Sequence, residues 1–100
     1  MSQRIYRRAI IRGRVQGVGY RDWTRHVARS RGIEGWVRNR RDGSVEAVFV
    51  GTPEAVPRMI ATCHHGPPSA EVEWIEEHGA TITDLDLRRP NESFSVIATA

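Results

Sequence analysis

The first segment of the chain alternates between apolar and polar residues. Residues 5 to 15 place small and branched apolar side chains on one side and arginines mostly on the other. Side chains of a strand point alternately to its two faces, so this period of two predicts a strand with one buried face. The residues expected on that buried face are Ala9, Ile11, Gly13 and Val15.

A helix is predicted after a glycine-containing turn, from Asp22 to Arg31. Trp23 and Val27 share one face of it, and Gly32 can end it in a left-handed conformation. Two strands are predicted next, at 33–39 and 44–50, because Asp-Gly between two such segments is a strong hairpin signal. Their expected inward residues are Ile33, Gly35 and Val37 in the first, and Val45, Ala47 and Phe49 in the second.

A second helix is predicted after Thr52, which can cap it, with Pro53 at its first position, where a missing N–H costs little. Pro57 removes another donor, so this helix either begins later or bends. Its buried stripe is expected to consist of Val56, Met59, Ile60 and Cys63.

Two strand patterns remain. One strand is predicted with Val72 and Trp74 inward, and a final strand through Phe94, Val96 and Ala98, whereas 79–93 match no element. The order is therefore strand, helix, strand, strand, helix, strand, with an extra C-terminal strand. This order predicts an α+β sandwich of the βαββαβ type, with two helices on one face of a mostly antiparallel sheet.

The length and composition fit one folded domain over residues 1–100, with 39% hydrophobic and 27% charged residues. The N-terminus lacks the apolar stretch of a secretory signal, and no apolar run is long enough to span a bilayer. The single cysteine, Cys63, cannot form an internal disulfide. We therefore expect a cytoplasmic protein without a membrane partner, with a monomer as the default.

The basic residues narrow the class of partner. All 15 are arginine, and the formal net charge is +3. A compositional bias of the source genome explains the missing lysines equally well. The planar guanidinium suits phosphates and carboxylates, so the partner is expected to be anionic, either a small phosphorylated molecule or a nucleic acid.

The segment from Gly13 to Arg21 has the features of an anion site. Gly17 and Gly19 lead into a helix, where unpaired N–H groups and the helix dipole favour negative charge. Arg21 at that same end opposes the dipole unless an anion lies between them. No Lys-Ser or Lys-Thr follows the last glycine, and the glycine spacing differs from the dinucleotide pattern. On its own, such a loop is also compatible with a tight connection and nothing more.

Two motifs carry a family resemblance. Residues 11–21, IRGRVQGVGYR, resemble the first motif of the acylphosphatase family, and residues 35–45, GWVRNRRDGSV, with Gly51 beyond, resemble its second. The family's ferredoxin-like fold agrees with the order of elements predicted above. Tyr20 departs from the family, which usually has phenylalanine or another apolar residue there, and its hydroxyl needs a partner if buried.

The resemblance implies an acylphosphatase, which hydrolyses small acyl phosphates to a carboxylate and inorganic phosphate without a metal or a cofactor. It implies that Arg21 binds the phosphoryl group and that Asn39 orients the attacking water. The backbone N–H groups expected to complete the phosphate cradle are those of Gln16, Gly17, Val18, Gly19, Tyr20 and Arg21. A phosphate or sulfate ion is expected to fit the same place.

Other readings have weaker support. Cys63, His64, His65 and His78 lack the i, i+4 pairing of helical metal sites, so no metal is expected. A nucleic-acid module using arginines with Trp23, Trp36 and Trp74 is the main alternative function, since the sequence pI is near 10.0. A third alternative is a carbamoyl-phosphate-handling domain of the kind found in larger maturation proteins, but its partner domains are missing from these 100 residues.

Overall fold

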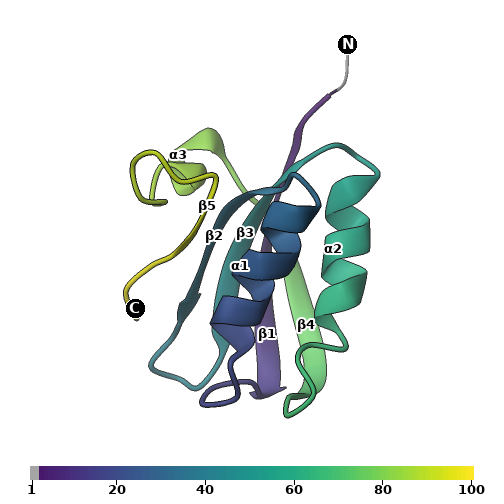
Figure 1. Ribbon diagram of the computed structural model, residues 1–100, viewed down its shortest axis with the longest axis vertical. Helices are drawn as coiled ribbons and strands as arrows, with labels where there is room; N and C mark the ends of the chain where they lie inside the picture. The colour runs from purple at the N-terminus through teal and green to yellow at the C-terminus, as the bar shows by residue number, and fades with distance from the viewer. Residues whose placement is uncertain (1–2) are drawn as a thin grey trace.

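The computed structural model describes residues 3–100 as a five-stranded sheet with two long helices on one face (Figure 1). The strands and helices follow the predicted order, with one short helix added. They are β1 (Ile5–Arg14), α1 (Tyr20–Ser30), β2 (Glu34–Asn39), β3 (Val45–Gly51), α2 (Ala55–Cys63), β4 (Glu71–Gly79), α3 (Ile82–Leu85) and β5 (Phe94–Val96). The predicted α+β sandwich is confirmed.

The sheet has the strand order β4-β1-β3-β2-β5. Four of the strands pair antiparallel, whereas β5 pairs parallel to β2 along Gly35–Val37. β2 thus lies between the hairpin partner β3 and the late strand β5. The backbone N–H of Ala100 donates to the Asn39 carbonyl at 3.0 Å, so the C-terminal residues continue alongside the end of β2.

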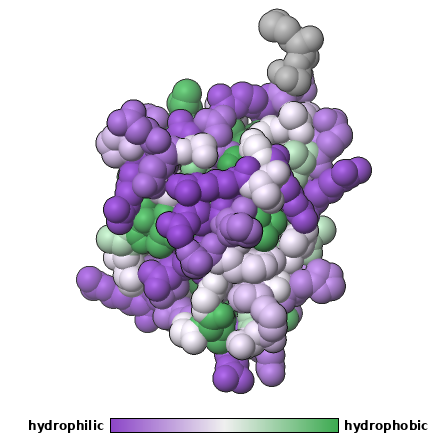
Figure 2. Space-filling model, viewed as in Figure 1, coloured by the Kyte–Doolittle hydropathy of each residue, from purple (hydrophilic) through white to green (hydrophobic). Residues whose placement is uncertain are grey.

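The main core lies between the sheet and the two long helices. Apart from Gly13, which is half-buried, the predicted inward residues of β1, β2 and β3 and the predicted stripe of α2 are buried, as Ala9, Ile11, Val37, Phe49, Met59 and Cys63 illustrate. Gly32 has a φ of 68° and ends α1 as predicted. Thr52 Oγ1 accepts a hydrogen bond from Ala55 N at 3.0 Å, and Pro57 lies in the first turn of α2, where its missing donor costs no helical bond. Outside this core, the surface on the helix side is mostly hydrophilic (Figure 2).

The segment 79–93, which matched no predicted element, covers part of the opposite face of the sheet. Thr81 and Asp84 form a capping box at the start of α3, and Leu85 is buried against Trp36 and Val48. The indole Nε1 of Trp36 donates to the Asp84 carbonyl at 2.7 Å. This small second core explains why Trp36 is only 1% exposed although it faces away from α1 and α2.

The prediction that Trp74 points inward was wrong, and a β-bulge is the reason. Gly13 pairs with Val72 and Arg12 pairs with Trp74, so Glu73 is an extra residue in β4. The extra residue shifts the alternation by one, which leaves Val72 and Ile75 against the main core and turns Trp74 outward. Trp74 is 52% exposed. The final strand also ends earlier than predicted, since β5 stops at Val96 and Ala98 is exposed.

Gly13→Ala is expected to destabilise the fold by about 3 kcal/mol, at the upper end of overpacking effects. Gly13 has a φ of 128°, and an added Cβ would clash with the Glu71 carbonyl and lie 2.7 Å from Glu73 N. The free energy of unfolding, measured in urea, tests this. The control is Gly79→Ala, whose added Cβ meets no atom within 4 Å. Equal stability of the two variants would contradict the role given to the bulge.

Candidate active site

The connection between β1 and α1 forms a loop of left-handed glycines. Gly17 and Gly19 have φ values of 73° and 80°, which L side chains rarely adopt. Gly19 is the N-cap of α1 and contributes no side-chain cap, so the first N–H groups of the helix are free for another acceptor. α1 begins at Tyr20, two residues before the predicted start. This start was missed from the sequence because Gly19 has no side chain that could act as a recognisable helix cap. The result is an anion-binding helix terminus.

Gln16 ties this loop to the β2–β3 hairpin through its side chain. Its Nε2 donates to the carbonyls of Arg40 and Ser44 at 2.7 Å and 2.9 Å. The side chain of Gln16 is therefore directed at the hairpin, which leaves only its backbone N–H for a bound anion. The side chain of Val18 packs against the main core, so Val18 too can offer only its backbone N–H to a bound anion.

The hairpin itself is closed by Asp42. Its Oδ1 accepts from the Ser44 hydroxyl at 2.6 Å and from the Ser44 backbone N–H at 2.9 Å. These two hydrogen bonds, helped by Arg40 and Arg12, lower the pKa of Asp42 to about 2. The carboxylate is therefore ionised at every pH near neutrality and holds the turn that follows Asn39.

Asn39 is the last residue of β2. Its Oδ1 is buried and accepts no hydrogen bond from any group within residues 3–100. A buried carbonyl oxygen without a donor costs about 1–3 kcal/mol, so such atoms are normally satisfied by water or by a ligand. This unsatisfied oxygen is the second feature, after the helix terminus, that points to a binding site.

A pocket of about 280 Å³ brings the two features together. The glycine loop and the start of α1 line it with residues that include Gly17, Gly19 and Arg21. Asn39 lines the same pocket from β2. The two side chains expected to act together, 18 positions apart in the sequence, are thus close in space. Within the described residues, the Arg21 guanidinium makes no ion pair or hydrogen bond, so its charge is available to an anion.

Three pocket residues were not predicted. Asp22 and Arg25 come from the first two turns of α1, and Val96 comes from β5. Arg25 stands four positions after Arg21, so helical periodicity alone places both on one face. Val96 could not be assigned to the site from the sequence, because its place depends on the parallel pairing of β5 with β2.

Tyr20 joins the start of α1 to the end of α2. Its ring is 2% exposed, and its hydroxyl donates to the Cys63 carbonyl at 2.6 Å. The hydroxyl therefore has the partner that burial demands. Burial raises the pKa of Tyr20 far above its usual value. Burial also raises the pKa of the Cys63 thiol to about 12, so this cysteine is a buried apolar residue with no thiolate to act as a nucleophile.

Residues 3–100 contain no group of three or more His, Cys, Asp or Glu side chains placed to hold a metal ion. None of the helices in this range is long and apolar enough to cross a membrane. The nucleic-acid alternative rests on three tryptophans, of which Trp36 is buried and Trp23 packs against the main core. Trp74 is 52% exposed, so a single tryptophan is open to stack on a base. The arginines of the opposite sheet face are paired with carboxylates, as Arg38 is with Glu46 at 2.7 Å.

The fold and pocket together describe a small α+β domain with a site suited to an anion. The model of the acylphosphatase family matches residues 7–96, and the chain belongs to this family.

Individual relatives agree with this assignment. An acylphosphatase of Bradyrhizobium diazoefficiens is 57% identical over 90 residues, which cover 90% of this chain and 91% of that protein. The crystal structure of acylphosphatase from Bacillus subtilis has a TM-score of 0.79 and 31% identity, over 93% of this chain and 98% of that one. Full-length HypF in its phosphate- and nucleotide-bound form matches 99% of this chain with 12% of its own, at a TM-score of 0.83 and 21% identity. The last is a likeness of fold alone.

Tyr20→Phe is expected to lower the free energy of unfolding by about 1–3 kcal/mol, because it leaves the buried Cys63 carbonyl without its donor. Since the Tyr20 hydroxyl stays protonated, the loss should be the same at pH 7 and pH 9. Urea unfolding at both pH values measures it. Tyr6→Phe is the matched control, as the half-buried Tyr6 hydroxyl makes no hydrogen bond within the described residues, and it should change stability by less than about 0.5 kcal/mol. If Tyr6→Phe lowers the free energy of unfolding by the same amount, the stabilising role of the hydrogen bond from Tyr20 to the Cys63 carbonyl is refuted.

Proposed function

We propose that this chain hydrolyses the carboxyl–phosphate bond of small acyl phosphates, with Arg21 binding the phosphoryl group and Asn39 orienting the attacking water. The observation that supports this most directly is the pocket at the start of α1, which is lined both by Arg21, whose guanidinium is unpaired within residues 3–100, and by Asn39, whose buried Oδ1 has no donor there. Membership of the acylphosphatase family supports the reaction type.

In this proposal the phosphoryl oxygens bind between the helix terminus and Arg21. Backbone N–H groups from Gln16 to Arg21 donate to them, and the Arg21 guanidinium can hold two oxygens at once. The partial positive charge of the helix and the arginine charge repel each other until the anion lies between them. Phosphoryl transfer spreads charge over three equatorial oxygens, so donors fixed in advance supply most of the rate enhancement.

Asn39 supplies the acceptor that the water needs. Its Oδ1 accepts a hydrogen bond from the water, which directs a water lone pair toward phosphorus. The new bond forms between the water oxygen and phosphorus, while the bond between phosphorus and the acyl oxygen breaks. The bonding pair leaves with the carboxylate, and the water proton passes to an oxygen of the phosphate.

The leaving group explains why the site needs few catalytic groups. The conjugate acid of a carboxylate has a pKa of about 4, so no general acid has to protonate it. The proposal therefore requires no metal, no cofactor and no covalent intermediate, and it leaves Cys63 and the histidines without a role in the reaction. A monomer acting on free small molecules, in the cytoplasm, is sufficient for this chemistry.

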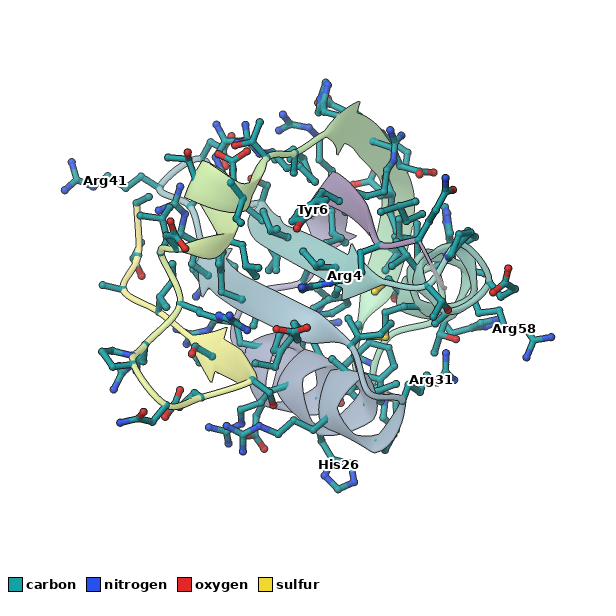
Figure 3. The ribbon with its side chains drawn as sticks, turned by 90° about the horizontal axis from the view of Figure 1, so that it is seen from above. Arg4, Tyr6, His26, Arg31, Arg41 and Arg58 are labelled. Carbon is teal, nitrogen blue, oxygen red and sulfur yellow. The ribbon has the colours of Figure 1, made fainter. Side chains whose placement is uncertain are left out.

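Arg21→Ala and Asn39→Ala are each expected to reduce kcat for acetyl phosphate by about 10²–10³-fold, the usual cost of losing one transition-state contact. Arg58→Ala is the control, because Arg58 is exposed on α2 and projects away from the molecule in Figure 3. The assay is run with a metal chelator present, and circular dichroism confirms that each variant is folded. An inert wild type, or full activity in both site variants, would disprove the proposal. A wild type that loses its activity only when the chelator is added would disprove the metal-free part of it.

Gln16 is a positioning residue in the same proposal. Gln16→Glu keeps the size of the side chain but removes the Nε2 donor that joins the loop to the Arg40 and Ser44 carbonyls. Because the backbone of the cradle is unchanged, we expect kcat to fall about tenfold with KM changed by less than about threefold. Gln16→Asn, which retains a shorter donor, should recover part of kcat. If kcat is unchanged in the glutamate variant, the two hydrogen bonds from the Gln16 side chain to the hairpin do not position Asn39.

A further inference from the structure

The pocket is larger than a phosphoryl group. Its volume of about 280 Å³ corresponds to about nine water molecules at roughly 30 Å³ each. A phosphoryl group has only a phosphorus and three free oxygens, so the remaining space is available to the acyl group. The residues around that space that do not belong to the phosphate cradle include Asp22 and Arg25 on α1 and Val96 on β5.

Arg25 is a second cation beside the cradle. It follows Arg21 by four positions on α1, where Cβ atoms one turn apart are about 5–6 Å from each other on one face. One of its nitrogens, Nη2, pairs with Asp22 Oδ1. Its other N–H groups donate to no atom within residues 3–100. A guanidinium has five N–H donors, so Arg25 can bind a further anion while it remains in contact with Asp22.

We propose that Arg25 binds a carboxylate at the far end of the acyl group and so makes the enzyme favour acyl phosphates of dicarboxylic acids. This inference rests on the function proposed above. Consecutive Cα atoms, three bonds apart, are separated by about 3.8 Å. Five bonds separate phosphorus from the far carboxylate carbon of a four-carbon acyl group, which is about 6 Å at the same rise per bond and so close to the roughly 5–6 Å between Cβ atoms one helical turn apart.

Asp22 opposes this binding and sets its strength. It lies in the first turn of α1 and is the carboxylate that already pairs with Arg25. A substrate carboxylate must share the guanidinium with Asp22 and is repelled by it. Removing the Asp22 charge is therefore expected to strengthen the binding of a dicarboxylic substrate, whereas removing the Arg25 charge weakens it. A general loss of structure would weaken substrate binding in both variants, so opposite effects of the two substitutions identify a specific contact.

Other arginines near this end of the molecule are less suited to the role. Arg29 donates to the Phe94 carbonyl at 2.9 Å and so holds β5. Arg40 lines a separate hollow on the other face of the sheet and lies 3.9 Å from Asp42. Arg41 is exposed on the hairpin and projects outward in Figure 3. None of these three lines the pocket that contains Arg21 and Asn39.

The test compares fumaryl phosphate with crotonyl phosphate. Both have the same four-carbon trans skeleton, but only fumaryl phosphate ends in a carboxylate, and the trans double bond keeps that carboxylate from attacking its own phosphoryl ester. The wild type is expected to have a kcat/KM about five- to tenfold higher for fumaryl phosphate, most of it in KM, as expected for one charge-assisted hydrogen bond in a partly exposed site.

Arg25→Gln should remove this preference, so that its kcat/KM values for the two substrates agree within about twofold, and Asp22→Asn should increase the preference. Arg58→Gln is the matched control, since it lowers the net charge equally and lies outside the pocket. An active wild type with no preference, or a preference that survives in Arg25→Gln, would overturn the assignment of Arg25 alone. A wild type inert toward both substrates would overturn the proposed hydrolysis as well.

Discussion

The site depends on holding two segments together that the sheet alone leaves apart. The glycine loop leaves β1 and the hairpin leaves β2, and in the sheet β3 separates these two strands. Gln16 bridges the gap by donating from a single amide nitrogen to two carbonyls of the hairpin. Asp42 closes the turn, and the Ala100 N–H binds the carbonyl of Asn39. The place of Asn39 relative to the cradle is thus fixed by the side chains of Gln16 and Asp42, which bind the hairpin backbone, and by the backbone of Ala100.

A site built in this way keeps its charges fixed and its chemistry simple. The positive end of α1 and the Arg21 guanidinium come from one helix, so their spacing does not depend on any motion of one element against another. The groups that receive the anion are oriented before it arrives, which avoids the cost of reorienting dipoles during the reaction. Tyr20 adds to this rigidity, because its hydroxyl anchors the first residue of α1 to the last residue of α2.

Most of the fold could be predicted from periodicity, because each long element has one buried face. The alternation within a single strand failed to predict which face a residue occupies where the pairing with the neighbouring strand contains a bulge. Val72 and Trp74 look like neighbours on one face, and only the pairing with Gly13 and Arg12 reveals the extra residue between them. The short helix α3 was missed although Thr81 and Asp84 have capping-box spacing, because its four residues are too few to show a helical period.

The site itself was predicted by motif more than by physics. The glycine loop indicated only an anion, and the roles of Arg21 and Asn39 came from the family resemblance. The structure places both side chains in one pocket, and their catalytic roles stay predictions. Arg25 could have been found from its spacing to Arg21, whereas Val96 depends on a pairing between strands more than 50 residues apart in the sequence.

The bulge in β4 has a consequence for solubility. β4 is the edge of the sheet, and an exposed edge strand can pair with the same strand of another molecule and begin an aggregate. The extra residue interrupts the regular row of hydrogen-bonding groups that such pairing requires. Two glutamates beside the bulge, Glu71 and Glu73, add negative charge to this edge, whereas Glu76 and Glu77 are paired with arginines of β1. The irregularity that turns Trp74 outward therefore also makes this edge a poorer template for pairing with another strand.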